Sequence, residues 1–450
     1  MFLNRRRLLL GSLSSAALLA TPARAATPKQ QGLDAARFGV RPNASEDQSQ
    51  RLQRAIDRAA QAGAPLLLSP GLYRAAGLTL RAGSQLTGVR GATRIALTGG
   101  PSLLSAEGAE AVTLTGLTLE GGNLPLARDG GLVNLTAARD LRITDCTITN
   151  ANGNAIRLFQ STGAVTGNII TGSADNALYC VDNSKLELRA NKISKSGNGG
   201  IRVWQSLKRS DGSVVADNII EDTGARAGGS GQNGNAVNVY RAADVTVRGN
   251  TIRRAAFSAV RGNAASNFLV IGNNCAGFGE TAMYAEFDYE NATFLDNIID
   301  DAANGISVTN FDVGGHGGLV RGNQVRNIGQ RVLATLTEGA GNGFGISVEA
   351  DVIATGNIVE NCAYASLKLG FGPYLRNVTA SANTIRRSPY GIVVSVVPGA
   401  GRAAITDNRI EGATRGAIVG MEWHKAVSGD LAIGGVERYP QLRLSGNQAS

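Results

Sequence analysis

Three side chains have the clearest chemical potential, and we predict that Arg202, Arg261 and Tyr284 are catalytic. β-Elimination next to a uronic carboxylate needs neutralisation of that carboxylate, a base for the C5 proton and an acid for the leaving oxygen. Either arginine could neutralise the carboxylate. Tyr284, or Tyr179, could act as base or acid if a neighbouring arginine lowers the pKa of its phenol.

A second set of side chains is predicted to bind the substrate: Arg157, Tyr179, Trp204, Asn238, Tyr240 and Glu286. Aromatic rings stack on sugar faces, and arginine binds a carboxylate through two parallel hydrogen bonds, so the set suits a polymer of uronic acids. The alternative is an ordinary solvent-facing surface, because strands favour arginine and tyrosine and cation–π pairs would explain the same cluster. Either interpretation requires these residues to lie in line.

An internal repeat provides such a line. Each unit has a small residue or Asp, then Asn, then Ile or Val two positions later, as in residues 167–170 and 217–220. The asparagines recur 23 to 34 residues apart, at Asn168, Asn191, Asn218, Asn250, Asn273, Asn297, Asn323, Asn357, Asn383 and Asn408. Short β-branched runs cut by Gly, Asn and Asp predict strands rather than helical repeats. One unit cannot bury its own apolar face, but units stacked about 4.8 Å apart can. We therefore predict an all-β, single-stranded parallel β-helix.

The repeated asparagine has a structural interpretation. A tight bend between two sheets needs a residue that tolerates the left-handed region, which asparagine does. Stacked asparagines can also hydrogen-bond along the axis as a ladder. We therefore expect the asparagines to hold the coils together and to take no part in chemistry.

The strand after each asparagine carries the predicted site. Its outward positions form one file that runs through Arg157, Tyr179, Arg202, Asn238, Arg261, Tyr284, Ser307, Ser347, Lys368, Val393 and Val419. A second file, two residues further on, includes Trp204, Tyr240, Glu286 and Glu349. Because the later coils mostly carry Ser, Thr, Val and Gly, we place the site in the coils from 157 to 286. Insertions at 225–234 and 331–343 leave from one corner and could wall the groove or be flexible decoration.

The N-terminal part of the chain differs from the repeats. Residues 45–48 (Ser-Glu-Asp-Gln) resemble a capping box, and apolar residues at helical spacing then predict a helix over 47–62, with Gly63 as its stop. This helix should cover the open end of the stack. We expect short strands at 66–68, 78–80, 86 and 95–97, and closing strands at 431–433 and 442–444. The predicted divisions are a cap with first coils over 34–100 and continuous repeats over 101–447.

The first residues predict export. Arg5, Arg6 and Arg7 precede an apolar stretch of residues 8–19, and residues 23–25 (Ala-Arg-Ala) form a small-x-small cleavage pattern. The stretch is too short to span a bilayer. Residues 1–25 are therefore predicted to be a signal peptide handled by the twin-arginine machinery, with a plain secretory signal as the alternative, and the mature protein is expected to be periplasmic or secreted.

Specific stretches carry a family resemblance. Residues 38–40 (Phe-Gly-Val), the helix and residues 65–73 resemble the N-terminal cap of the pectate-lyase-like β-helix superfamily, and with the repeats the similarity spans about residues 34–447. The whole chain also resembles an uncharacterised family of twin-arginine-exported repeat proteins. The superfamily implies a right-handed helix and, often, action on acidic polysaccharides as lyase, hydrolase or epimerase. It does not fix which.

Composition limits the partners. The formal charge is +9, and four of the arginines lie within residues 1–25, which leaves +5 for the mature chain. The basic residues after that point are scattered, so nucleic-acid binding is disfavoured, and no later apolar run is long enough to span a membrane. Cys146, Cys180, Cys275 and Cys362 lack metal-ligand spacing and are expected to pack in the core, with a disulfide left open. No cofactor is predicted; Ca²⁺ near Glu286 or Glu349 is possible and unsupported.

Two classes of function remain. The leading hypothesis is an exported protein that binds an acidic glycan and cleaves it by β-elimination. The alternatives are a non-catalytic binding or structural protein of the cell envelope and a glycoside hydrolase. Hydrolysis would need two opposed carboxyls about 5 to 9.5 Å apart, and the sequence offers no clear pair.

Overall fold

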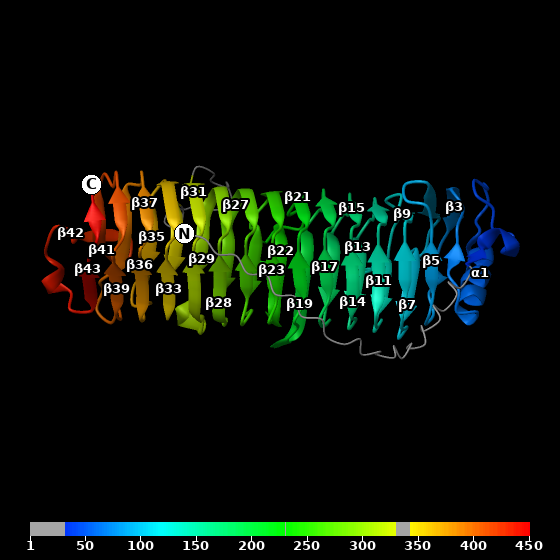
Figure 1. Ribbon diagram of the computed structural model, residues 1–450, viewed down its shortest axis with the longest axis horizontal. Helices are drawn as coiled ribbons and strands as arrows, with labels where there is room; N and C mark the ends of the chain where they lie inside the picture. Colours follow the sequence, from blue (N-terminus) through cyan, green and yellow to red (C-terminus); the bar gives the residue numbers. More distant parts are fainter. Residues whose placement is uncertain (1–31, 230, 330–342) are drawn as a thin grey trace, which may run out of the picture. The chain divides into compact units, whose positions relative to one another are not determined.

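A computed structural model describes residues 32–229, 231–329 and 343–450 of the chain, all within one compact unit, Gly32–Ser450. The unit is a stack of coils with a short helix at one end (Figure 1). The predicted signal peptide, the insertion from 331 to 342 and residue 230 lie outside the described residues.

Three parallel sheets form the sides of the stack. Sheet 1 has 16 strands, one below the next along the axis. They are β1 (Leu33–Asp34), β2 (Leu66–Leu67), β5 (Gln85–Thr87), β8 (Thr113–Thr115), β11 (Leu141–Thr144), β14 (Gly163–Thr166), β17 (Glu187–Arg189), β20 (Val214–Ala216), β23 (Thr246–Arg248), β26 (Leu269–Ile271), β28 (Glu290–Leu295), β30 (His316–Arg321), β33 (Val352–Thr355), β36 (Val378–Ser381), β39 (Ala403–Thr406) and β43 (Leu442–Ser445).

The other 28 strands form sheets 2 and 3, which share two long strands that bend through the corner between them, β27 (Asn274–Glu286) and β29 (Ile298–Val308). Sheet 2 also contains β3 (Gly71–Ala75), β6 (Thr93–Leu97), β9 (Thr118–Glu120), β12 (Thr147–Thr149), β15 (Ile169–Thr171), β18 (Lys192–Ser194), β21 (Ile219–Thr223), β24 (Thr251–Ala255), β31 (Gln324–Ile328), β34 (Ile358–Cys362), β37 (Thr384–Arg386), β40 (Arg409–Glu411) and β44 (Gln448–Ala449). Sheet 3 also contains β4 (Leu78–Thr79), β7 (Leu104–Glu107), β10 (Gly131–Thr136), β13 (Asn154–Phe159), β16 (Asn176–Val181), β19 (Gly199–Ser210), β22 (Asn235–Ala243), β25 (Val260–Asn263), β32 (Phe344–Val348), β35 (Ala365–Leu369), β38 (Tyr390–Ser395), β41 (Gly416–Glu422) and β42 (Lys425–Asp430). The predicted parallel β-helix is confirmed.

The asparagine ladder is present and runs one coil further than predicted, to Asn447. In each step the side-chain Nδ2 donates to the Oδ1 of the next asparagine at 2.9 to 3.1 Å, from Asn168 through to Asn447. Each Nδ2 also donates to a backbone carbonyl of the coil before, as Asn168 does to Ile143 at 2.9 Å. The side chains are buried, so the ladder satisfies amides that would otherwise be costly to enclose.

The expected backbone role of the asparagines was wrong. In each coil the residue before the asparagine is left-handed, such as Gly167 at φ 70° or Asp217 at φ 58°, and the ladder asparagines have negative φ. Small residues, Gly and Asp precede the asparagines because that position makes the bend. The asparagine is needed for its amide alone.

The N-terminal helix closes one end, as predicted. α1 (Ser49–Gln61) buries Leu52, Ala55, Ile56 and Ala59 against the first coils, and Gly63 follows its end with φ 63°. The predicted capping box is wrong: the Gln48 side chain hydrogen-bonds Arg41 instead, and the Asp47 carboxylate accepts from the Ser49 N–H at 2.9 Å. Two 3-10 turns, η1 (Ala35–Phe38) and η2 (Phe311–Val313), lie elsewhere in the stack, and η3 (Val436–Arg438) lies near its other end.

The C-terminal end differs from expectation. Residues 431–433 form a turn, and the closing strand is β42, which pairs antiparallel with β41. The predicted strand at 442–444 is present as β43. All four cysteines are buried and free, which confirms the core-packing interpretation, and burial raises the pKa of Cys146 to about 11 and of Cys275 and Cys362 to about 12.

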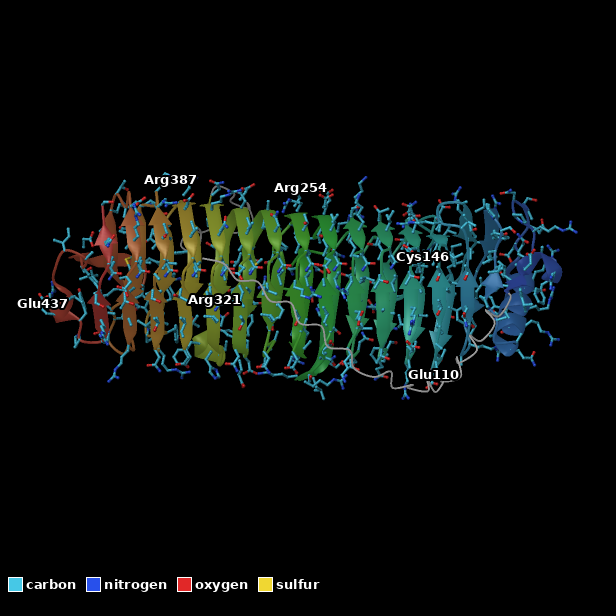
Figure 2. All side chains as sticks on the ribbon, in the orientation of Figure 1. Glu110, Cys146, Arg254, Arg321, Arg387 and Glu437 are labelled. Atoms are coloured by element: carbon cyan, nitrogen blue, oxygen red, sulfur yellow. The ribbon has the colours of Figure 1, made fainter. Side chains whose placement is uncertain are left out.

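Charges on the outer surface are paired between coils. Arg254 and Arg387 project from one edge of the stack (Figure 2), where Arg254 binds Asp222 at 2.6 Å and Arg387 binds Glu360 at 3.1 Å. Such exposed pairs contribute little to stability. No helix in the described part of the chain is long and apolar enough to cross a membrane.

Candidate functional site

The register of sheet 3 brings the predicted site residues into one file, as expected. Successive strands pair Arg157 with Tyr179, then Arg202, Asn238, Arg261, Tyr284, Ser307, Ser347, Lys368, Val393 and Val419. The second file pairs Phe159, Val181, Trp204, Tyr240, Asn263 and Glu286 in the same order. Neighbouring members are therefore about 4.8 Å apart.

Arg202 lies beneath the insertion at 225–234. Its side chain is 6% exposed, and Nη2 donates to the Asn233 Oδ1 of the insertion at 2.5 Å. The guanidinium also lies 4.9 Å from the Trp204 ring and 6.0 Å from the Tyr179 ring. The insertion thus folds over the file, and burial lowers the pKa of Arg202.

The aromatic members of the two files contact one another edge to face. The ring centroid of Trp204 lies 5.9 Å from that of Tyr179 and 5.6 Å from that of Tyr240. Trp204 Nε1 donates to Asn238 Oδ1 at 3.0 Å, and Asn238 Nδ2 donates to the Gly231 carbonyl of the insertion at 2.9 Å. This cluster presents ring edges and leaves Asn238 buried.

Arg261 is committed to two carboxylates. It binds Glu286 through Nε at 2.6 Å and Nη2 at 2.7 Å, and Nη1 binds Glu280 at 2.9 Å. Both Arg261 and Glu286 are buried. Because the two carboxylates already balance its charge, Arg261 is poorly placed to neutralise a substrate carboxylate.

The condition set for the two tyrosines, a phenol pKa lowered by a neighbouring arginine, is not met. The Arg261 guanidinium lies 5.1 Å from the Tyr284 ring, but burial outweighs its charge and raises the pKa of Tyr284 to about 12. The pKa of Tyr179 is also raised, again by burial. Both phenols therefore stay protonated at neutral pH. Arg157, further along, donates to Asn134 Oδ1 at 3.2 Å and stacks on Phe159.

The open part of the file lies beyond Tyr284. A pocket of about 250 Å³ opens there on the outer face of sheet 3. It is lined by Thr281, Tyr284, Asn304, Ile306, Ser307, Thr309, Asn310, Phe344, Ser347, Glu349 and Lys368. Of the predicted site residues, only Tyr284 lines it.

Glu349 and Lys368 lie in this pocket on adjacent coils and have shifted pKa values of opposite sense. Burial raises the pKa of Glu349, whose carboxylate accepts from the Phe311 N–H at 2.9 Å. Burial lowers the pKa of Lys368, and the charge of Glu349 opposes that shift. Within the described part of the chain no carboxylate lies within ion-pair distance of Lys368 Nζ. General acid–base catalysis requires a proton donor and a proton acceptor in one pocket, and these two residues can provide them.

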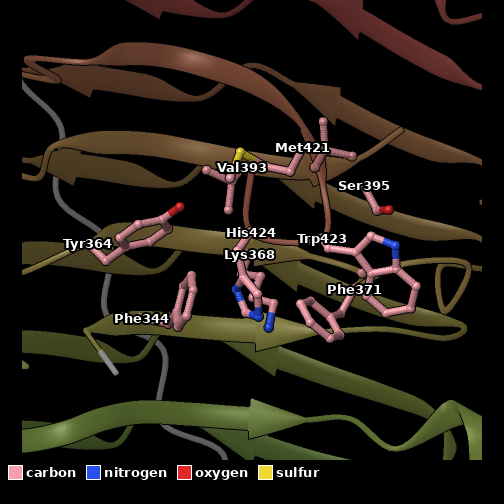
Figure 3. Close-up of a pocket in the computed structure, with 11 residues that line it drawn as sticks. Phe344, Tyr364, Lys368, Phe371, Val393, Ser395, Met421, Trp423 and His424 are labelled. Carbon is pink, nitrogen blue, oxygen red and sulfur yellow. The ribbon is translucent and has the colours of Figure 1, made fainter. Parts of the chain in front are cut away.

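An aromatic hollow continues from the pocket. Lys368 lies between Phe344 and Phe371 (Figure 3), with Nζ 4.8 Å and 4.4 Å from the two ring centroids. The Phe371 ring packs against Trp423 at 5.1 Å and against His424 at 4.8 Å. The hollow itself encloses only about 10 Å³, so its rings form a platform beside the pocket.

The sequence predicted the positions of Lys368 and Glu349 in the two outward files, but neither was among the predicted site residues. The signal that could have found them is that each is a charged residue among coils that otherwise carry Ser, Thr and Val outward. The described residues include no group of three or more His, Cys, Asp or Glu side chains that could hold a metal ion.

Comparison with known proteins supports the fold. The family described as "Right handed beta helix region" matches residues 102–231 and 207–338. A search of the curated proteins finds no match. Among solved structures, the catalytic unit of a GH87 α-1,3-glucanase from Streptomyces thermodiastaticus aligns with a TM-score of 0.57 at 16% identity, covering 95% of this chain and 70% of that one.

Two further structures are similar. The N-terminal fragment of bacteriophage phi29 gene product 12 aligns with a TM-score of 0.52 at 13% identity, covering 87% of this chain and 69% of that one. The A-module of a mannuronan C-5 epimerase from Azotobacter vinelandii has a TM-score of 0.44 at 17% identity, covering 93% and 99%. At such identities the likeness concerns the fold alone.

Proposed function

This chain belongs to the right-handed β-helix family, and we propose that it binds an acidic polysaccharide along sheet 3 and cleaves it by β-elimination in the pocket at Glu349 and Lys368. One observation carries the proposal: a carboxyl with a raised pKa and an amine with a lowered pKa face one open pocket from adjacent coils. Shifted pairs of this kind mark acid–base sites.

Each group has a role in the reaction. The unprotonated Lys368 amine takes the C5 proton, the C4–O bond breaks as the C4–C5 double bond forms, and the Glu349 carboxyl gives its proton to the departing oxygen. The sugar carboxylate gains negative charge in the transition state. The hydroxyls of Ser307, Ser347 and Tyr284 line the pocket and can donate to it.

The roles first assigned to the two arginines change in this proposal. Arg261 holds Glu286, Glu280 and the Tyr284 ring in place, so it is a positioning residue. Arg202 lies six coils from Lys368 and cannot reach the same bond. The aromatic platform of Phe371 and Trp423 offers apolar surface for a sugar face next to the reacting unit.

The test is a panel of uronic polymers incubated with the mature protein, with the ultraviolet absorbance of the unsaturated product as readout. We expect Lys368→Ala and Glu349→Gln to lower the rate by about a hundredfold or more. Lys192→Ala, an exposed lysine of β18 on another sheet, should leave it unchanged. New reducing ends without absorbance would show a hydrolase, and binding without either product would show a non-catalytic binding protein; both overturn the proposed reaction.

Export by the twin-arginine route is part of the proposal and rests on Arg5, Arg6 and Arg7 before the apolar stretch. Replacing Arg5, Arg6 and Arg7 together by Lys should retain the full-length precursor inside the cell. Fractionation of producing cells measures this, and normal export of that variant would favour the plain secretory signal.

A further inference from the structure

A second, shorter asparagine ladder in sheet 3 is interrupted beside Arg202. Asn176 Nδ2 donates to Asn154 Oδ1 at 2.8 Å, and the register continues from Asn176 through Gly199 to Asn235. Gly199 therefore occupies a position at which the neighbouring coils have an asparagine. A Cβ at Gly199 would lie 2.4 Å from Asn176 Oδ1 and 3.1 Å from Arg202 Nε, so the missing side chain makes room for the guanidinium.

The interruption leaves two buried polar atoms without hydrogen-bond partners among the described residues, Asn176 Oδ1 and Arg202 Nε. One is an acceptor and the other a donor, and both border Gly199. Burying a polar atom without a partner destabilises the fold, so an unpaired acceptor beside an unpaired donor indicates a place for a ligand that supplies both partners.

The free donor lies on the edge of arginine that binds carboxylates. Nε and Nη2 of a guanidinium point the same way and together grip both oxygens of a carboxylate. In Arg202 the Nη2 position is taken by the neutral Asn233 Oδ1 at 2.5 Å, and the Nε position is taken by nothing among the described residues. Asn233 thus fills half of a two-point site with a weaker acceptor than a carboxylate.

The segment that supplies Asn233 is a glycine-rich insertion between β21 and β22. Gly228, Gly229 and Gly234 have φ between 67° and 74°, and the segment contacts the file through Asn233 on Arg202 and through Gly231 O on Asn238 Nδ2. At its two ends, the N–H groups of Ala227 and Gly234 donate to Asn198 at 2.8 Å and 2.7 Å. Displacement of Asn233 alone would free Arg202 Nη2 for another acceptor.

We propose that this niche is an anion subsite that binds one uronic acid residue, whose carboxylate replaces Asn233 on Arg202 and whose hydroxyl donates to Asn176 Oδ1. The ligand class rests on the proposed function, but the site does not belong to the reacting pocket. Six coils separate Arg202 from Lys368, about 29 Å at the usual strand spacing. The subsite therefore holds a distant unit of the same polymer.

Tryptophan fluorescence can test this because the chain has only Trp204 and Trp423. The Trp423→Phe protein, which leaves Trp204 as sole reporter, is titrated with sodium D-glucuronate, D-galacturonate or D-mannuronate, with D-glucose as the neutral control. We expect a saturable change with at least one uronate and none with glucose. In this background Asn233→Ala should bind about tenfold more tightly, because the competing acceptor is gone.

Two further variants should weaken uronate binding instead. Asn233→Asp places a carboxylate of the protein on Arg202, and Arg202→Gln removes the guanidinium. Both variants should abolish the fluorescence change, whereas Arg248→Gln on sheet 1 should keep it. Absence of binding in both the parent and Asn233→Ala, or equal binding by Arg202→Gln, overturns the subsite. Binding here without turnover would overturn only the proposed reaction, and turnover without binding here would overturn only the subsite.

Discussion

Two stretches of the two neighbouring files on the outer face of sheet 3 behave differently. In the early stretch, from Arg202 to Glu286, the charges are neutralised or covered: Arg261 binds two carboxylates, and Arg202 lies under Asn233. In the late stretch, from Ser307 to Lys368, a pocket is open, and Glu349 and Lys368 in it have no ion-pair partner within the described ranges.

The difference separates charge that supports the fold from charge available for chemistry. A buried arginine with two carboxylates satisfies its own hydrogen bonds, and its pKa is raised further from neutrality despite burial. Burial instead raises the pKa of Glu349 and lowers the pKa of Lys368, so each is shifted toward its neutral form. A high density of charged residues therefore does not by itself indicate groups that are available for proton transfer.

The largest expected effect concerns stability. Arg261→Leu leaves the buried Glu286 and the partly buried Glu280 without their cation, which should lower the free energy of unfolding by about 3–5 kcal/mol. Lys368→Met removes an amine whose charged form burial already disfavours, so its effect should stay within about 1 kcal/mol. Urea unfolding followed by circular dichroism measures both. Equal losses in the two variants would remove the distinction between the stretches.

The next effect is on the pH profile of the proposed reaction. Lys368 must be unprotonated, so the rate rises with pH until its lowered pKa is passed, and Glu349 must be protonated, so the rate falls above its raised pKa. The profile should be bell-shaped, each limb approaching a tenfold change per pH unit. Initial rates across the pH range measure it. A rate that changes only near pH 12, the pKa of Tyr284, would indicate that Tyr284 and not Lys368 transfers the proton.

The contrast also explains what could be predicted from the sequence. The repeat fixed by Asn168 and its successors predicted the coils, and counting from it predicted every neighbour in the file, because strand register has period two and tolerates no slip. The partners of Arg261 were not predictable, since Glu280 reaches it from the corner where β27 bends into sheet 3. The cover over Arg202 depends on how an insertion folds, which the repeat does not encode.

A smaller effect concerns the pH dependence of stability, which should have opposite signs for Glu349 and Glu360. Burial raises the pKa of Glu349 in the folded protein, so its stabilising contribution is complete below the unfolded pKa and is lost as pH rises through the folded value. Glu349→Gln cannot ionise and avoids that loss. The variant should match the wild type in acid and exceed it at higher pH by about 1 kcal/mol.

Glu360 provides the matched control for that measurement. Its hydrogen bonds to Arg386 lower its pKa, so its contribution is present above the unfolded pKa and is lost as pH falls. Glu360→Gln should therefore become less stable than the wild type as pH rises. Unfolding midpoints at several pH values decide the matter, and the same sign for both variants would contradict the assigned environments.

The smallest effect compares the two tryptophans. Trp204 belongs to the closed stretch, where Tyr179 and Tyr240 flank its ring and Asn238 accepts its N–H, whereas Trp423 beside the pocket is 50% exposed. Acrylamide should quench the Trp204→Phe protein, which reports Trp423, more strongly than the Trp423→Phe protein. Asn233→Ala in the latter background should raise quenching, because removing the contact with Arg202 loosens the cover. Quenching of Trp204 as strong as that of Trp423 before this change would mean that the early stretch is already open in solution, and that its paired charges do not close it to ligands.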